Sequence, residues 1–66
     1  MHWTETVLDE EWRCGPYRIE RFSCHFSNRY NCMRSFDNGR GYFAVAKPQK
    51  TVDAAKRACR RDALRR

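Results

Sequence analysis

Several residue classes are scarce in this 66-residue chain, and each scarcity limits what it can be. Long aliphatic side chains are few, and there are only three glycines and two prolines. No apolar stretch approaches the length of about 18 residues that a membrane-spanning helix needs. The first residues are acidic and lack an apolar segment, so a secretory leader is not expected. One small domain in a reducing cytosol, with no membrane partner, is therefore the expected setting.

Recognisable catalytic and metal-binding patterns are also missing from the sequence. No two carboxylates stand out as an acid and a base, and residues 39–41 are too short a segment to cradle phosphate. A Cys24–His25 nucleophilic pair is not favoured, because adjacent strand residues point to opposite faces. The four cysteines contain no C-x-x-C pair, although a structural zinc ion or a disulfide stays open as an alternative. We expect a protein that is not an enzyme and has no cofactor, no metal and no catalytic residue.

Positive charge, in contrast, is abundant and unevenly distributed. The net charge is +6, with fourteen Lys and Arg against eight Asp and Glu. Residues 1–11 hold four of the acids and no Lys or Arg, whereas residues 12–66 hold all fourteen cations. We predict an acidic N-terminal arm over residues 1–11 and a single small domain over residues 12–66. The arm could fold back on the basic body, repel unwanted polyanions or serve only solubility.

The hydrophobic pattern predicts three β-strands. Apolar and charged residues alternate from Tyr17 onward, as they do in a half-buried strand. Two turn signals separate extended segments: a Gly-Pro pair after Cys14, and the Asn38-Gly39 pair, which accepts the positive φ angles of tight hairpins. Residues 1–11 fit a short helical turn or an edge strand equally well. The predicted strands cover residues 17–22, 29–36 and 42–46, with a connection over residues 23–28.

The rest of the chain predicts one helix that packs on the sheet. Thr51 is a good N-cap, Asp53 suits the helix dipole, and strong helix formers follow without Gly or Pro. A stripe of small side chains recurs at helical spacing: Val52, Ala55, Ala58, Cys59 and Ala63. The expected fold class is α+β, a three-stranded antiparallel sheet packed against one C-terminal α-helix. Its core would draw on the nine aromatics, and because so small a core gives about 3–5 kcal/mol, a homodimer or a bound partner would add stability.

The predicted helix also holds the strongest candidate binding surface. Residues 47–66 contain eight Lys or Arg against two Asp, more than the helix dipole alone favours. Such a cluster attracts phosphates or acidic protein surfaces, so the expected partner is an acidic protein or nucleoprotein complex, or DNA or RNA. Strand arginines next to aromatics could add base contacts, although those aromatics alternatively serve only as core. The candidate contact residues are Lys56, Arg57, Arg60, Arg61 and Arg65 on the helix, with Arg18, Arg34 and Arg40 on the sheet.

Three segments carry a resemblance to known proteins: Gly-Pro-Tyr-Arg-Ile from residue 15, Gly-Tyr-Phe-Ala-Val-Ala from residue 41, and Thr-Val-Asp-Ala-Ala-Lys-Arg-Ala-Cys from residue 51. Over about residues 12–64 the chain resembles the small sheet-plus-helix accessory proteins of phages and prophages. That resemblance implies action by binding, as in anti-CRISPR and other anti-defence proteins, on a host protein or nucleoprotein complex in the host cytoplasm. The net charge of +6 departs from the acidic DNA mimics among them.

The order of three strands and a helix is also similar to the DNA-binding domain of arm-type phage integrases. This second resemblance implies a sheet that contacts the major groove. We therefore predict a non-enzymatic, phage-type inhibitor that binds a host nucleic-acid-processing or defence complex through its basic helix. The alternative is a small DNA-binding module that contacts duplex phosphates with the helix and with the sheet arginines.

Overall fold

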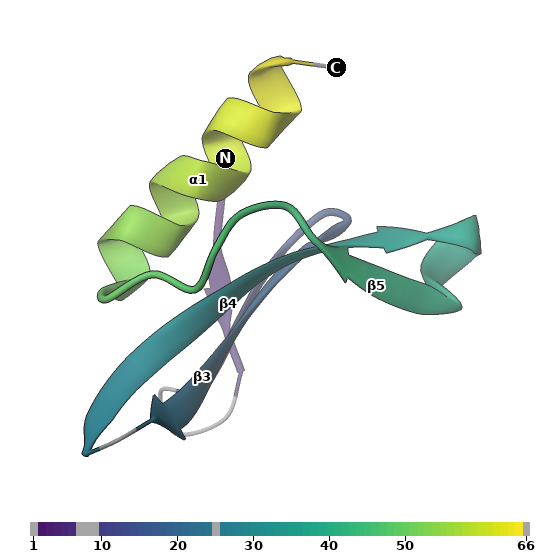
Figure 1. Cartoon of the computed structure of the whole chain (residues 1–66). Coiled ribbons are helices and arrows are strands. Elements are labelled where there is room, and N and C mark those ends of the chain that lie inside the picture. The colour runs from purple at the N-terminus through teal and green to yellow at the C-terminus, as the bar shows by residue number, and fades with distance from the viewer. Residues whose placement is uncertain (1, 7–9, 25, 66) are drawn as a thin grey trace.

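A computed structural model describes residues 2–6, 10–24 and 26–65. These residues form a five-stranded antiparallel sheet with one helix on one of its faces (Figure 1). The predicted α+β class, with an antiparallel sheet and a C-terminal helix, is confirmed. The strands lie in the sheet in sequence order: β1 (Thr4–Glu5), β2 (Glu11–Cys14), β3 (Tyr17–Cys24), β4 (Ser27–Phe36) and β5 (Gly41–Ala44). A short 3-10 helix η1 (Asp37–Gly39) joins β4 to β5, and α1 (Val52–Leu64) follows.

The prediction of three strands is wrong in number, because β1 and β2 extend the sheet beyond β3. Trp12 of β2 lies opposite Ile19 of β3, and its neighbours Glu11 and Arg13 face the other side of the sheet. β1 adds only two residues beyond β2, and Glu5 lies opposite Trp12. Strands this short depend on pairing with a neighbour more than on their own sequence. The pattern therefore left an edge strand within residues 1–11 as one of two alternatives, which β1 bears out, and it did not indicate β2. Residues that the sequence assigned to an acidic arm are thus hydrogen-bonded into the sheet.

The hairpin of β3 and β4 is longer than predicted. The predicted connection over residues 23–28 is wrong, since the two strands stay paired as far as Cys24 and Ser27. Phe26 lies at the tip, fully exposed, with a φ of 67°. This end of the hairpin extends past the helix (Figure 1). Its side chains are therefore not selected for burial, and they show no alternation of apolar and polar residues. The predicted turn after Cys14 is confirmed, with Gly15 at a positive φ of 59°.

The chain after β5 continues along the edge of β4. β5 ends at Ala44, two residues earlier than predicted. The Val45 N–H then donates to the Cys32 carbonyl at 2.9 Å, and Gln49 pairs with Tyr30. This segment leads directly into α1, which then runs along one face of the sheet (Figure 1).

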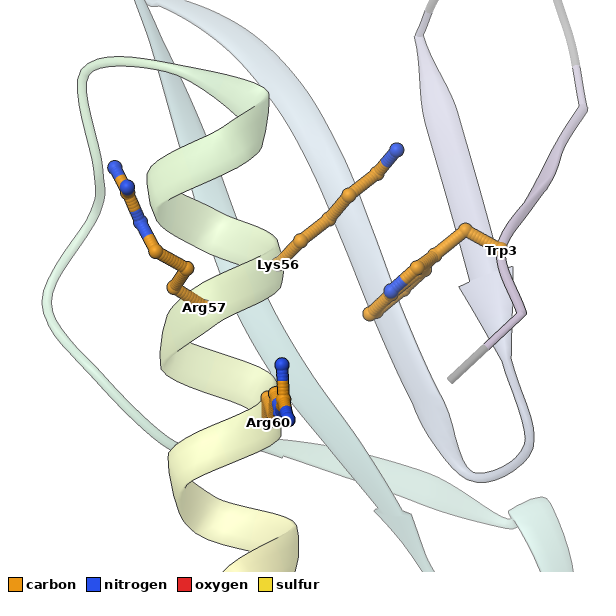
Figure 2. A pocket seen from close by; sticks show the side chains of 4 residues that line it. All are labelled: Trp3, Lys56, Arg57 and Arg60. Carbon is orange, nitrogen blue, oxygen red and sulfur yellow. The ribbon is translucent and has the colours of Figure 1, made fainter.

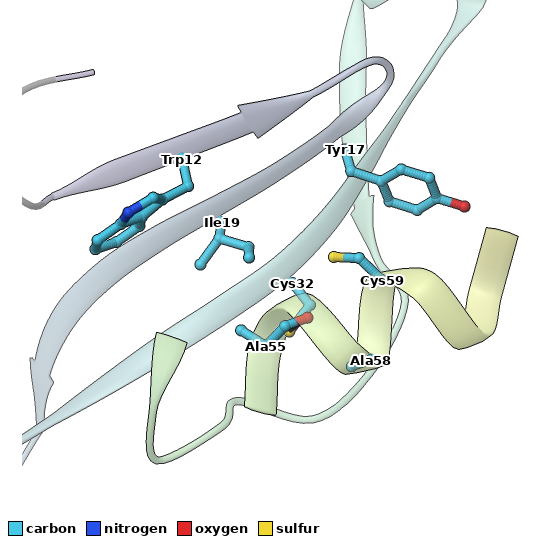
Figure 3. Close-up of a cluster of buried hydrophobic side chains, with 7 residues drawn as sticks. All are labelled: Trp12, Tyr17, Ile19, Cys32, Ala55, Ala58 and Cys59. Carbon is cyan, nitrogen blue, oxygen red and sulfur yellow. Dashed lines mark hydrogen bonds between the residues drawn. The ribbon is translucent and has the colours of Figure 1, made fainter. Parts of the chain in front are cut away.

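The helix packs its small side chains on β3 and β4 as predicted (Figure 3). The Thr51 hydroxyl accepts the Ala54 N–H at 3.1 Å, which confirms the N-cap. Small residues on α1 let its backbone approach the sheet closely, and Val52 and Ala63 pack at the margin of the core. The buried core consists of Trp12, Tyr17, Ile19, Cys32, Ala55, Ala58 and Cys59.

Aromatic side chains contribute less to this core than predicted. Among the described aromatics only Trp12 and Tyr17 are buried, whereas Phe26, Phe36 and Phe43 are exposed. The helix covers the centre of the sheet and reaches neither the tip of the β3–β4 hairpin nor the end where β4 meets β5 (Figure 1). The interpretation of all nine aromatics as core is therefore wrong.

Candidate nucleic-acid interface

The helix presents its cations on the side that faces away from the sheet. Because the stripe of small residues is buried, the remaining positions of α1 project outward around its circumference. The four arginines are exposed, and the lysine is half-buried. We name these five side chains the basic helix face: Lys56, Arg57, Arg60, Arg61 and Arg65.

One flank of the basic helix face lies beside Trp3. Lys56, Arg57, Arg60 and Trp3 line a hollow of about 200 Å³ (Figure 2). Trp3 comes directly before β1 and packs against the edge of the core, so pairing of β1 with β2 holds its ring next to the helix. The hollow thus combines an indole ring with three cations, a pair of features that can hold a base and its phosphate.

Sequence reasoning missed Trp3 as a site residue. It lies in the segment predicted as an arm, with no local pattern to fix its position. The missing signal is tertiary, because only the order of β1, β2 and β3 in the sheet brings residue 3 back to a helix that begins at residue 52.

The other flank of the basic helix face lies on the β5 side. Arg61 and Arg65, one helical turn apart, line a second hollow of about 170 Å³ beside Val45 and Ala46, and the carboxylate residue Asp62 lines it with them. The two hollows place cations on opposite sides of the same helix. A ligand that lies along α1 therefore meets positive charge on both sides of the helix axis.

The five cations of this face lack acidic partners within the described ranges. Each ion pair there involves another arginine: Arg13, Arg18, Arg21, Arg34 or Arg40. The acids of α1 are Asp53 and Asp62, and the Asp62 carboxylate contacts Tyr17 and Arg34 of the sheet. Among the described residues, positive charge without an ion pair therefore lies mainly on the helix, and Arg29, Lys47 and Lys50 carry the rest.

Arg18 lies on the face of the sheet opposite the helix. Its Nη2 donates to Glu20 Oε2 at 2.8 Å, and its guanidinium lies 5.4 Å from the centre of the Tyr42 ring. Its Nε is 2.8 Å from Glu11 Oε1 and is buried, but its N–H makes no hydrogen bond. The hydrogen bond from the Arg13 side chain lowers the pKa of Glu11 below its usual range, and the charge of Arg18 lowers it further. These contacts place Glu11, the last residue of the predicted acidic arm, against Arg13 and Arg18.

Arg34 joins the helix to the sheet. Its Nη1 donates to Asp62 Oδ2 at 2.9 Å, and its guanidinium stacks 4.5 Å from the centre of the Phe43 ring. Arg40 is exposed next to η1, with its Nε 3.8 Å from Asp37. Arg18, Arg34 and Arg40 thus line neither hollow of the basic helix face, although Arg34 contacts α1 through Asp62.

The cysteines give no sign of a second kind of site in the described part of the chain. No group of three or more His, Cys, Asp or Glu is placed there to hold a metal ion, and Cys14, Cys32 and Cys59 are free thiols. A hydrogen bond with Cys32, together with burial, raises the pKa of the Cys59 thiol. Cys59 is thus a protonated core residue. His25 of the Cys24–His25 pair lies outside the described residues.

Comparisons with protein families, with curated proteins and with solved structures find no match for this chain. No helix in the described ranges has the length and apolar character needed to cross a bilayer. The function is therefore argued from the geometry and the charge of the basic helix face.

Proposed function

We propose that this protein binds nucleic acid through the basic helix face and acts by binding rather than by catalysis. The supporting observation is that five cations, without acidic partners among the residues that the structure describes, lie on both flanks of one outward-facing helix. With 13 residues, α1 is about 20 Å long. A helix with its side chains is about 10–12 Å across, which matches the width of about 12 Å of the DNA major groove. In that groove each flank meets the phosphates of one strand.

The strength of this interaction follows from counterion release. Each phosphate contact adds about −0.9 to the slope of log affinity against log salt on duplex DNA. Five contacts give a slope of roughly −4.5, so a fourfold rise in salt weakens binding by roughly 500-fold. Such binding is insensitive to sequence, because phosphate contacts position a protein without reading bases.

The same surface supports the predicted biological setting. An inhibitor of phage type that acts on a host nucleic-acid-processing complex would meet the phosphates of the nucleic acid which that complex holds. The basic helix face serves that role and the role of a simple DNA-binding module equally. The phage-type setting stays a prediction, and the polyanion contact is the step that both roles share.

Fluorescence anisotropy with a labelled DNA duplex tests the proposal. The variant carries Arg57→Gln, Arg60→Gln and Arg61→Gln, and the matched control carries Arg40→Gln, Lys47→Gln and Lys50→Gln, so both lose equal charge. We expect the helix variant to reduce the salt slope by roughly 3, and the control to reduce it by less than 1.

Far-UV circular dichroism confirms that both variants keep the fold. Equal losses in the two variants would show that net charge alone drives binding. No binding by the unmodified protein at low salt would remove the proposal altogether.

A further inference from the structure

The two edges of the sheet differ in how they are protected from another strand. β1 is only two residues long and carries the acid Glu5. β5, Gly41–Ala44, has no charged residue and no proline. Natural sheets use short strands, charged side chains and proline to block edge-to-edge pairing. β5 has neither a charged side chain nor a proline, and it is longer than β1.

The backbone of β5 has hydrogen-bonding groups free to accept a further strand. The Val45 N–H donates to the Cys32 carbonyl. In an antiparallel pair, every second residue of a strand bonds to its neighbour and the residues between them point away, so this bond determines which residues of β5 face β4. Phe43 and Gly41 therefore bond to β4, while the N–H and C=O groups of Tyr42 and Ala44 point away from it. No described strand lies beyond β5.

Exposed aromatic side chains surround the same edge. Phe36 is 51% exposed, Phe43 39% and Tyr42 36%, and the Phe36 and Phe43 rings are 6.0 Å apart. The Phe36 ring also lies over Gly41, where a Cβ would come within 2.6 Å of it. A cluster of exposed aromatics beside unpaired backbone is typical of an interaction surface.

We propose that β5 is where a second copy of this chain binds, antiparallel, to give a two-fold symmetric dimer with one continuous sheet. Pairing centred on Phe43 places Tyr42 opposite Ala44 of the partner subunit, and all the outward groups of both residues are then bonded. In this register the nearest charged residue, Arg40, lies opposite Ala46 of the partner subunit. No like charges face each other across the strands, so the edge is complementary to itself.

The dimer axis is perpendicular to the sheet, and both copies of α1 therefore lie on the same face. The two basic helix faces then point to the same side, which doubles the cations available to one polyanion. The contact spans one four-residue strand, so it belongs to the small interfaces, and we expect dissociation in the micromolar range. This inference goes beyond nucleic-acid binding, and its test needs no nucleic acid.

Sedimentation equilibrium over a range of protein concentrations tests the dimer. Ala44→Pro removes one outward N–H and leaves the bonds to β4 intact. Phe43→Lys places two like charges opposite each other, and Phe26→Ser is the control that removes an exposed aromatic far from β5. We expect the unmodified protein and the control to dimerise, and both β5 variants to stay monomeric while folded.

An introduced thiol tests the register. Phe43→Cys places two thiols directly across the two-fold axis, at a Cα separation that a disulfide can span. We expect mild oxidation to give a covalent dimer linked through position 43, identified by peptide mapping, and Arg40→Cys to give none. An unmodified protein that is monomeric at every concentration, or a dimer unaffected by the β5 variants, would overturn the proposal.

Discussion

Replacement of Asp62 by alanine should loosen the C-terminal half of α1 from the sheet. Asp62 Oδ2 accepts hydrogen bonds from the Tyr17 hydroxyl at 2.7 Å and from Arg34 Nη1 at 2.9 Å. A hydrogen bond to a charged group contributes about 1.5–3 kcal/mol. The Asp62 and Arg34 side chains are 22% and 20% exposed, so solvent weakens the pair only in part. We expect Asp62→Ala to lower the free energy of unfolding by roughly 2–4 kcal/mol.

A loss of that size is a large fraction of the total for so small a domain. The free energy of unfolding of native proteins is roughly 0.05–0.15 kcal/mol per residue, which gives only about 3–10 kcal/mol for this whole chain. Tyr17→Phe keeps the buried ring and removes one donor to a charged group, so it should lower the free energy of unfolding by about 1.5–3 kcal/mol.

Urea denaturation followed by circular dichroism measures both changes as shifts of the midpoint at constant slope. Asp53→Ala is the control, because Asp53 lies on the same helix, is exposed and makes no described contact with the sheet. When Asp62 is already alanine, Tyr17→Phe should lower the free energy of unfolding hardly any further, because the acceptor of the Tyr17 hydroxyl is gone. If Asp62→Ala is no more harmful than the control, or if the effect of Tyr17→Phe persists without the carboxylate, the assigned role of Asp62 is wrong.

Two further predictions concern the sheet. Hydrogen bonding from Arg13 lowers the pKa of Glu11 below 4.5, so the ionised carboxylate stabilises the fold above that pH, and the contribution is lost as pH falls through the lowered pKa. Glu11→Gln should therefore be destabilising at neutral pH and neutral in strong acid; a penalty that is constant with pH in urea titrations would contradict this. Phe26 has a φ of 67° at an exposed tip, so Phe26→Gly should stabilise the fold by about 0.5 kcal/mol, whereas Phe26→Ala should not. Equal urea midpoints for the two variants would show that no strain is stored there.

The helix was predictable because its local signals agree. Thr51 supplies the cap, the small residues recur at helical spacing, and no Gly or Pro interrupts them. The strands β1 and β2 were less predictable, because β2 is ordered by pairing with β3 and β1 by pairing with β2, rather than by their own residues. The aromatics near β5 were assigned to the core because a sequence shows hydrophobicity but not the footprint of the helix.

The candidate site was predictable in part for the same reason. Periodicity alone shows that Arg57, Arg60 and Arg61 lie off the buried stripe. The engagement of Arg18 with Glu11 depends on strand register, and the contact of Arg34 with Asp62 joins residues 28 positions apart. Charge counting cannot distinguish a free cation from one that is already paired.

The pairing of Glu11 and Glu20 with the arginines behind the sheet has a kinetic consequence. One side of the molecule is close to neutral while the helical side is strongly positive, so the protein carries a sizeable electric dipole. In the field of a polyanion a dipole experiences torque as well as attraction. For the proposed polyanion target, this torque acts within about 8 Å at physiological ionic strength and favours collisions that begin with the helix toward the target.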